Sequence, residues 1–276
     1  ESSMVMYRTD LMEKAGLTMP KAPTWDFIRK AAKAMTDKKE GVYGLCLRGK
    51  AGWGENVALI TSMANSFGAR WFDENWKPQF NTPEWENTLQ YYVDVMKESG
   101  PAVAGAFVTN KKDSEVADKV GFALAPDNGL GKRGNWLWSW TLAVPASSKK
   151  PDAAMKFISW ATSKEYTQLV ADKKGWAKVP PGTRKSLYSN QKYMDAAPFA
   201  QITLDSIQSA DPKNPTVKPV PYVGIQFVAI PEFQGIGTAV GQQFSAALTG
   251  QMTVKQALST SQHLVERTMR KARYPK

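Results

Sequence analysis

Cysteine and histidine are almost absent from this chain of 276 residues, because each occurs only once. A single cysteine, Cys46, cannot form a disulfide within the chain and provides no metal-site spacing. The single histidine, His263, stands in a polar-rich segment near the end of the chain, where we expect it to face solvent. The sequence therefore shows no Ser/His or Cys/His nucleophile pair, and we expect neither a cofactor nor a bound metal.

Long apolar runs are missing as well. No run approaches the ~18 residues that a membrane-spanning helix needs, so we do not expect the chain to span a membrane. The first residues have neither a basic start nor an apolar run, so no signal peptide is visible and the chain is interpreted as mature, processed or truncated. The hydrophobic fraction of 42% is that of a globular protein, and the length allows one large domain or two ordinary ones.

Positive charge is in excess, with 36 Lys and Arg against 25 Asp and Glu and a net charge of +11. Such a balance raises nucleic acid or an anionic surface as partners. The basic residues of segment 147–192 are scattered through helical-looking sequence, however, and no zinc-finger, RNA-recognition or basic-zipper pattern accompanies them. We interpret them as a solvated basic face and expect no nucleic acid as partner. A nucleic-acid binder would lose affinity steeply with salt.

Aromatic residues are concentrated in one short run, Gly-Asn-Trp-Leu-Trp-Ser-Trp at residues 134–140. In an extended segment Trp136, Trp138 and Trp140 share one face, because successive side chains alternate. Indoles on one face suit either a packed core or stacking against a ligand. For Trp136 and Trp140 both alternatives stay open.

A glycine-rich loop at residues 48–56 is the second candidate for function. It follows residues 42–47, which we predict to be a short buried strand with an inert Cys46 thiol. Three glycines let the loop backbone approach a ligand closely. Its side chains offer cations, an indole, a carboxylate and an amide, at Arg48, Lys50, Trp53, Glu55 and Asn56. The structural alternative is a mobile polar surface loop.

Helical periodicity and capping residues predict most of the remaining elements. Thr9, Thr24 and Thr82 are expected N-caps of helices. Further helices are expected at 57–67, 151–161, 164–173, 232–248 and 253–273, and strands at 4–7, 120–125 and 134–145. The helix at 151–161 should turn Phe157, Ile158 and Ala161 inward. Four prolines in residues 211–221 predict an extended connector.

The order of these pieces resembles a known family. Tyr7-x-x-Asp10-Leu11, Ala-Gly-Leu at 15–17, Pro-Thr-Trp-Asp at 23–26 and Ala-Ala-Leu-Thr-Gly at 246–250 are similar to motifs of the carbohydrate-specific solute-binding proteins of ABC importers. The tryptophan run followed by the helix at 151–161 also matches, and its wording is most similar to the sorbitol/mannitol branch. The resemblance covers nearly the whole chain.

The resemblance implies an α/β fold with the two-lobed periplasmic-binding-protein (type II, venus-flytrap) architecture of the maltose-binding type. Each lobe would be a sheet flanked by helices, with the ligand in the cleft. Residues 1–143 would form most of the second lobe, 144–215 a helical part of the first lobe, and 216–276 a return to the second. Most of the first lobe would be missing, either because the protein is a fragment or because the sequence joins segments across omitted ones. In a fragment, an apolar surface of residues 151–192 would be uncovered.

The resemblance also implies a function. The protein would bind a polyol or monosaccharide with high affinity and deliver it to a membrane permease, as a monomer in the periplasm or tethered to the cell surface. Indoles would cover the C–H patches of the ligand while charged and amide groups bind its hydroxyls. In our hypothesis the tryptophans stack, Glu55 accepts, and Arg48, Lys50 and Asn135 donate. The expected ligand-binding residues are Arg48, Lys50, Trp53, Glu55, Asn56, Asn135, Trp136, Trp138 and Phe233.

A carbohydrate-active enzyme using Glu55 is the alternative function. Glycosidases need two carboxylates that flank the scissile bond, and no partner for Glu55 is marked by spacing. We therefore expect no enzymatic activity. Turnover separates the two functions, because a receptor leaves its ligand chemically unchanged.

Overall fold

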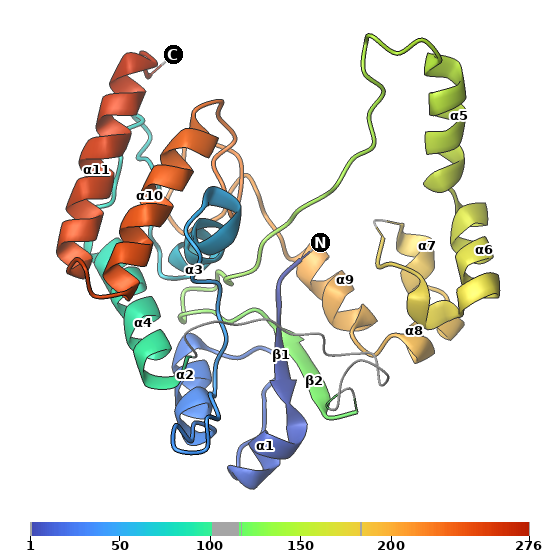
Figure 1. The fold of residues 1–276 in the computed structure, drawn as a ribbon, viewed down its shortest axis with the longest axis horizontal. Coiled ribbons are helices and arrows are strands. Elements are labelled where there is room, and N and C mark those ends of the chain that lie inside the picture. The colour runs from blue at the N-terminus through green and yellow to red at the C-terminus, as the bar shows by residue number, and fades with distance from the viewer. Residues whose placement is uncertain (1, 101–115, 117, 183, 276) are drawn as a thin grey trace.

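The helices gather in two groups joined by long irregular segments (Figure 1). A computed structural model describes residues 2–100, 116, 118–182 and 184–275. In Figure 1 α2, α3, α4, α10 and α11 lie on one side and α5 to α8 on the other, with α9 and the strands between them. An extended segment crosses from the centre of the molecule to α5, and a second connection returns from α9 to α10. None of the helices in the described ranges is both long and apolar enough to cross a membrane.

The elements follow one another along the chain with helices predominating. Their bounds are β1 Met4–Arg8, α1 Thr9–Lys14, α2 Trp25–Ala34, η1 Trp53–Val57, α3 Ala58–Ser66, α4 Pro83–Ser99, β2 Val120–Leu124, α5 Pro151–Ala161, α6 Lys164–Lys174, η2 Trp176–Lys178, α7 Lys185–Tyr188, α8 Gln191–Ala196, α9 Ala200–Gln208, α10 Phe233–Leu248 and α11 Val254–Lys271. Here η1 is a wide π-helical turn whose backbone is non-helical at Glu55, and η2 is a short 3₁₀ turn.

One sheet occurs among the described residues, and it pairs β1 with β2 in antiparallel register from Met4 opposite Leu124 to Arg8 opposite Val120. Both strands lie where the sequence predicts them. The larger sheets that the resemblance implies are not seen in these ranges. Two of the strands predicted from the sequence, at 42–47 and 134–145, pair with no strand of the described chain in a ladder. Residues 42–47 run irregularly, and the tryptophan run is extended but makes only an isolated bridge between Leu137 and Ser2.

Residues 42–47 are also less buried than expected. Cys46 is exposed, so the prediction of a buried thiol is wrong. The segment lies along the surface, and only Leu45 and Leu47 pack partly against the core. Neighbouring atoms still desolvate the Cys46 thiol in part and raise its pKa, which keeps it protonated at neutral pH and a weak nucleophile.

The larger core lies among α2, α3, α4, α10 and α11. Trp71 is its centre, 1% exposed, with the rings of Phe80 and Phe233 at centroid distances of 4.9 and 5.1 Å. Its indole N–H donates to Thr61 Oγ1 at 3.1 Å, so burial of the ring leaves no polar group unsatisfied. Residues that recur at helical spacing on α4 and α10, among them Leu89 and Phe244, are buried here. This core is the scaffold on which the candidate site is built.

A smaller core joins α6 to α9, and its buried members are Ala171, Val179, Leu187, Tyr188, Tyr193, Ala197 and Ala200. Helix α5 adds nothing to it. No residue of α5 is buried, and Phe157 and Met155 are 59% and 52% exposed. The prediction that Phe157 turns inward is therefore wrong, because the described chain offers no surface for that face to pack against. The expected division of the chain near residues 143 and 215 stays a prediction.

The three threonines expected as N-caps differ in outcome. Thr82 occupies the N-cap position of α4, but its side chain makes no cap hydrogen bond. Thr24 caps α2 by accepting from the Phe27 amide, as predicted. Thr9 is the first residue of α1 and makes no cap hydrogen bond, since Arg8 occupies the N-cap position. The strongest cap is at α11, where Thr253 and Gln256 form a reciprocal capping box.

We predict that Thr253→Ala lowers the free energy of unfolding by about 1 kcal/mol, because the Gln256 amide loses its acceptor. Thr238→Ala is the matched control, since its hydroxyl only bonds back to the Gln234 carbonyl within α10 and its loss should be nearly neutral. Urea unfolding of both variants measures the difference. Equal stabilities would contradict the role of the cap.

Candidate functional site

A small cavity opens where the glycine-rich loop meets the tryptophan run. Its volume is ≈ 260 Å³, and it is lined by Arg48, Trp53, Gly54, Ala58, Trp136, Trp138, Trp140 and Gln226. Ligand pockets usually occupy about 300–1,000 Å³, so this cavity suits a small molecule. Three separate parts of the chain supply the wall, which is mostly indole.

The indoles contact one another around Trp138. Its ring lies 6.0 Å from that of Trp53 and 5.8 Å from that of Trp140, measured between centroids. The Arg48 guanidinium lies over the Trp136 ring at 5.2 Å, which is within cation–π range. Trp140 is 77% exposed and forms the rim, so the alternative that it belongs to the core is wrong. The wall therefore combines flat apolar faces with one fixed cation.

Residues 48–56 are held to the core through their backbone. The Tyr92 hydroxyl on α4 donates to the Arg48 carbonyl at 2.8 Å, and burial raises the pKa of Tyr92, which keeps this donor protonated. The Ser245 hydroxyl on α10 donates to the Gly49 carbonyl at 2.9 Å. Gly52 has a φ of 152°, a conformation that favours glycine. These contacts tie the backbone of the loop to the core, while several of its side chains remain exposed.

Asn56 fastens the same loop from inside. It is fully buried, its side-chain oxygen accepts from the Gly52 amide at 3.2 Å, and its side-chain nitrogen donates to the Gly241 carbonyl at 2.9 Å and to Ser245 Oγ at 3.2 Å. These three hydrogen bonds of the Asn56 side chain are all made to other groups of the protein. The side chain therefore positions the loop against α10 and does not reach the cavity.

Two glycines on α10 make this close packing possible. A Cβ at Gly237 would lie 2.9 Å from the Trp53 Cβ. A Cβ at Gly241 would lie 2.8 Å from Asn56 Oδ1 and 2.9 Å from the Gly52 amide nitrogen. Because real Cβ contacts are longer than this, only glycine lets α10 support the loop at its present distance.

The tryptophan run is fixed from other elements. The Trp136 amide donates to Ser3 Oγ at 3.0 Å, and the Asn135 side chain donates to the Ser206 carbonyl of α9 at 3.0 Å. Gln226 bonds to both backbone polar groups of Leu137. The indoles thus project from a backbone tied to three other segments.

The structure brings four of the predicted site residues together in the cavity wall, namely Arg48, Trp53, Trp136 and Trp138. Lys50 and Glu55 lie outside the lining and form an ion pair of 3.8 Å with side chains 81% and 42% exposed. Such exposed pairs contribute little to stability.

The other three predicted residues lie behind the wall. Asn56 and Asn135 are 0% and 6% exposed and bond to the protein's own chain. Phe233 is 4% exposed and packs against Trp53 at a centroid distance of 6.4 Å. Their direct contact with a ligand stays a prediction. In this structure Asn56 and Asn135 fix backbone segments, and short polar side chains in that role look the same in sequence as side chains that bind solutes.

Sequence reasoning missed Gln226 as a lining residue. It stands between apolar neighbours, 89 positions from the Leu137 that it contacts, and no local pattern marks it. The one hint in the sequence was a single polar residue between apolar neighbours, shortly after the proline-rich connector.

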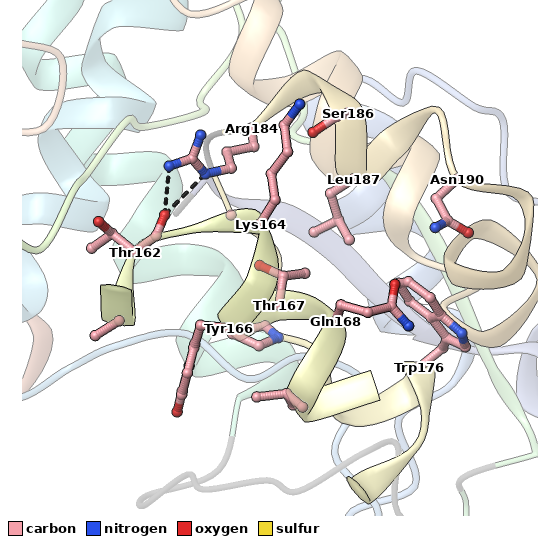
Figure 2. A pocket seen from close by; sticks show the side chains of 14 residues that line it. Thr162, Lys164, Tyr166, Thr167, Gln168, Trp176, Arg184, Ser186, Leu187 and Asn190 are labelled. Carbon is pink, nitrogen blue, oxygen red and sulfur yellow. Dashed lines mark hydrogen bonds between the residues drawn. The ribbon is translucent and has the colours of Figure 1, made fainter. Parts of the chain in front are cut away.

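A larger cavity of ≈ 420 Å³ lies in the other helical group, between α6 and α7 (Figure 2). Thr162, Lys164, Trp176 and Arg184 are among its lining residues. Figure 2 shows Arg184 directed back at its own chain, with Nε and Nη2 donating to the Thr162 carbonyl at 3.0 and 2.6 Å. Lys164 and Arg184 are exposed and no charged side chain is buried there. Arg48 of the smaller cavity is exposed as well, so charge does not separate the two. We take the smaller, tryptophan-walled cavity as the candidate site because four indoles line it, against the single indole of Trp176 in the larger one.

The chemistry available in the tryptophan-walled cavity is binding. The one ionisable lining side chain is Arg48, an obligate donor, and Gln226 adds an amide. Over the described ranges, no three His, Cys, Asp or Glu side chains are grouped so that they could hold a metal ion.

Similar proteins are known both in sequence and in structure. The sequence profile of the bacterial extracellular solute-binding proteins matches residues 1–168. A mannitol-binding protein of Pseudomonas aeruginosa is 52% identical over an alignment 302 residues long, gaps included. The alignment covers 100% of this chain and 69% of that protein. An ABC transporter solute-binding protein of Agrobacterium vitis S4 with bound D-mannitol has 67% identity and a TM-score of 0.96, covering 100% of this chain and 72% of that one.

A maltose-bound protein of T. maritima shares 25% identity and the same fold, with a TM-score of 0.77 over 97% of this chain and 70% of that one. The fold is thus that of the solute-binding proteins of ABC transporters. The chain belongs to the bacterial extracellular solute-binding protein family, and it spans 69% of the mannitol-binding relative's length. The α/β fold class expected from the sequence is confirmed.

Proposed function

We propose that the protein binds a sugar alcohol of the mannitol type in the tryptophan-walled cavity and delivers it to an ABC transporter permease. The observation that carries this proposal is the cavity itself, a small space walled by indoles with one guanidinium. The 52% identical relative is a mannitol-binding protein, and the 67% identical structure contains D-mannitol. Both support a polyol as the ligand.

The residue types fit the chemistry of a polyol. Each carbon of a sugar alcohol carries a hydroxyl on one side and C–H on another, so indole faces can cover the C–H patches. Arg48 has five N–H donors. One N–H of Nη1 donates to the Gly54 carbonyl at 2.8 Å, and the remaining ones can donate to ligand hydroxyls. The Gln226 amide donates to and accepts from the Leu137 backbone, so it supports the indole wall.

We further propose that the protein acts without turnover, as a monomer, in the periplasm or tethered at the cell surface. Support comes from membership of an extracellular solute-binding family and from a cavity whose single ionisable side chain is a guanidinium. Neither a polyol nor a monosaccharide would be altered by such a site.

Calorimetric titration of the intact protein with D-mannitol, D-sorbitol, ribitol, erythritol and maltose tests the proposal. We expect one polyol to bind at one equivalent, with an affinity that changes little between low and high salt, and to be recovered chemically unchanged. Absence of binding by every polyol would contradict the proposal, and conversion of the ligand would indicate an enzyme.

Arg48→Ala is predicted to lower polyol affinity by about 10- to 100-fold, because hydrogen bonds from a charged donor contribute about 1.5–3 kcal/mol each. Lys50→Ala is the matched control, since Lys50 is a cation of the same loop that lies outside the cavity lining. We expect at most a small loss for Lys50→Ala. Equal losses in both variants would show that the loop acts through its general charge.

A further inference from the structure

Gln226 pairs with the backbone at the middle of the tryptophan wall. Its side-chain nitrogen donates to the Leu137 carbonyl at 2.8 Å, and its side-chain oxygen accepts from the Leu137 amide at 3.3 Å. The amide therefore satisfies both polar groups of one residue, as the backbone of a neighbouring strand does in a sheet. Leu137 stands between Trp136 and Trp138, whose indoles line the cavity.

Gln226 is itself anchored to the core. It is 4% exposed, and the carbonyl of the preceding residue, Ile225, accepts from the Asn65 side chain of α3 at 2.8 Å. Asn65 is 2% exposed and belongs to the most buried helix of the larger core. A continuous path of hydrogen bonds thus runs from α3 through residues 225 and 226 to the wall.

Among the described residues the tryptophan run lies in no sheet, so separate contacts hold its backbone. Ser3 and Ser206 bond to residues 134–136, and the Gln226 pairing is the side-chain contact that holds both polar groups of Leu137, next to an isolated bridge with Ser2. In an extended segment, rotation of the Leu137 backbone would turn the side chains on either side of it. Trp138 would then lose its position against Trp53 and Phe227, whose ring centroids each lie 6.0 Å from its own.

We propose that Gln226 is a positioning residue, which holds the indoles of Trp136 and Trp138 in the arrangement that accepts the ligand. This inference rests on the proposed function for its effect on binding. The positioning itself concerns the unliganded protein and can be measured without any ligand.

The test uses Gln226→Met, which keeps the length of the side chain and removes both hydrogen bonds. Gln262→Met is the matched control. Gln262 is 9% exposed and also joins two backbone groups, since it accepts from the Phe80 amide and donates to the Pro78 carbonyl, each at 2.8 Å. It does not line the cavity.

We expect Gln226→Met to change the near-ultraviolet circular dichroism of the free protein and to lower the affinity for all bound polyols in common proportion, by about tenfold. Both variants should lower the urea midpoint, since each loses two hydrogen bonds to backbone groups. Gln262→Met should nevertheless leave polyol affinity within about twofold, because a contact distant from the cavity does not couple to it. In Gln226→Glu, acidification should restore affinity, since a protonated carboxyl again both donates and accepts. Wild-type affinity should not rise in parallel.

Three results would overturn the inference. One is an unchanged dichroism spectrum in Gln226→Met, whether or not a ligand binds. Another is unchanged affinity in a wild type that binds polyol. The third is a changed preference among polyols with an unchanged spectrum, which would mean that Gln226 contacts the ligand directly. Failure of the wild type to bind any polyol would instead refute the proposed function, and the spectrum would still decide the positioning role.

Discussion

Alanine in place of Trp138 is expected to reduce polyol affinity by about 30-fold or more, because truncating a central aromatic contact costs at least about 2 kcal/mol of binding free energy. Trp138 is the indole that the others surround, with Trp53, Trp140 and Phe227 at centroid distances of 6.0, 5.8 and 6.0 Å. Its loss removes one stacking face and also lets the neighbouring rings move into the space. Calorimetric titration measures the change in affinity.

Trp160→Ala is the control for this experiment. Trp160 lies on α5 and is 46% exposed, and among the described aromatic rings it contacts those of Phe157 and Tyr166. Its removal should leave polyol affinity unchanged, since no residue of α5 lines the tryptophan-walled cavity. Only Ala161, the last residue of the helix, reaches the larger cavity. If both variants bind as the wild type does, the ligand occupies another part of the protein.

A single methyl group on α10 should have the second large effect. Gly241→Ala is predicted to destabilise the fold by about 1–3 kcal/mol, because the new Cβ meets Asn56 Oδ1 and the Gly52 backbone at under 3.0 Å. The loop must move away from α10, which displaces Arg48 and Trp53. We therefore expect polyol affinity to fall by about tenfold as well.

The same helix provides the opposite case. Gly235 is exposed, and a Cβ there would meet nothing within 4 Å. Gly235→Ala should raise the free energy of unfolding by about 0.5–1 kcal/mol and leave affinity unchanged. Urea unfolding measures the stability of Gly235→Ala and Gly241→Ala, and calorimetric titration measures their polyol affinity. A stabilised Gly241→Ala would show that α10 and the loop are packed less tightly than described.

The sequence predicted those elements whose signals are local. The apolar spacing and end residues of α4, α10 and α11 place them within a few residues, because helix periodicity and caps are properties of neighbouring positions. The predicted strand at residues 42–47 failed, because an apolar run becomes a strand only where another strand lies beside it. The face of α5 failed similarly, since amphipathicity shows which side needs cover and not whether cover is present.

The candidate site divides along the same line. Spacing alone put Trp136 and Trp138 on one face, and glycine content marked the loop that carries Arg48 and Trp53. The roles of Asn56 and Gln226 depend on partners 185 and 89 positions away, so no local pattern could separate them from surface amides. Contact between distant segments is what the sequence did not reveal.

The cavity wall has a further consequence for the folding order of the molecule. Its parts come from residues 48–58, from 136–140 and from Gln226, and the loop is held in place by α10, still later in the chain. Contacts over such separations carry the largest loop-closure cost and form slowly. Competence to bind should therefore emerge only after the helical core has assembled, so a solute present during refolding selects finished molecules and cannot nucleate them.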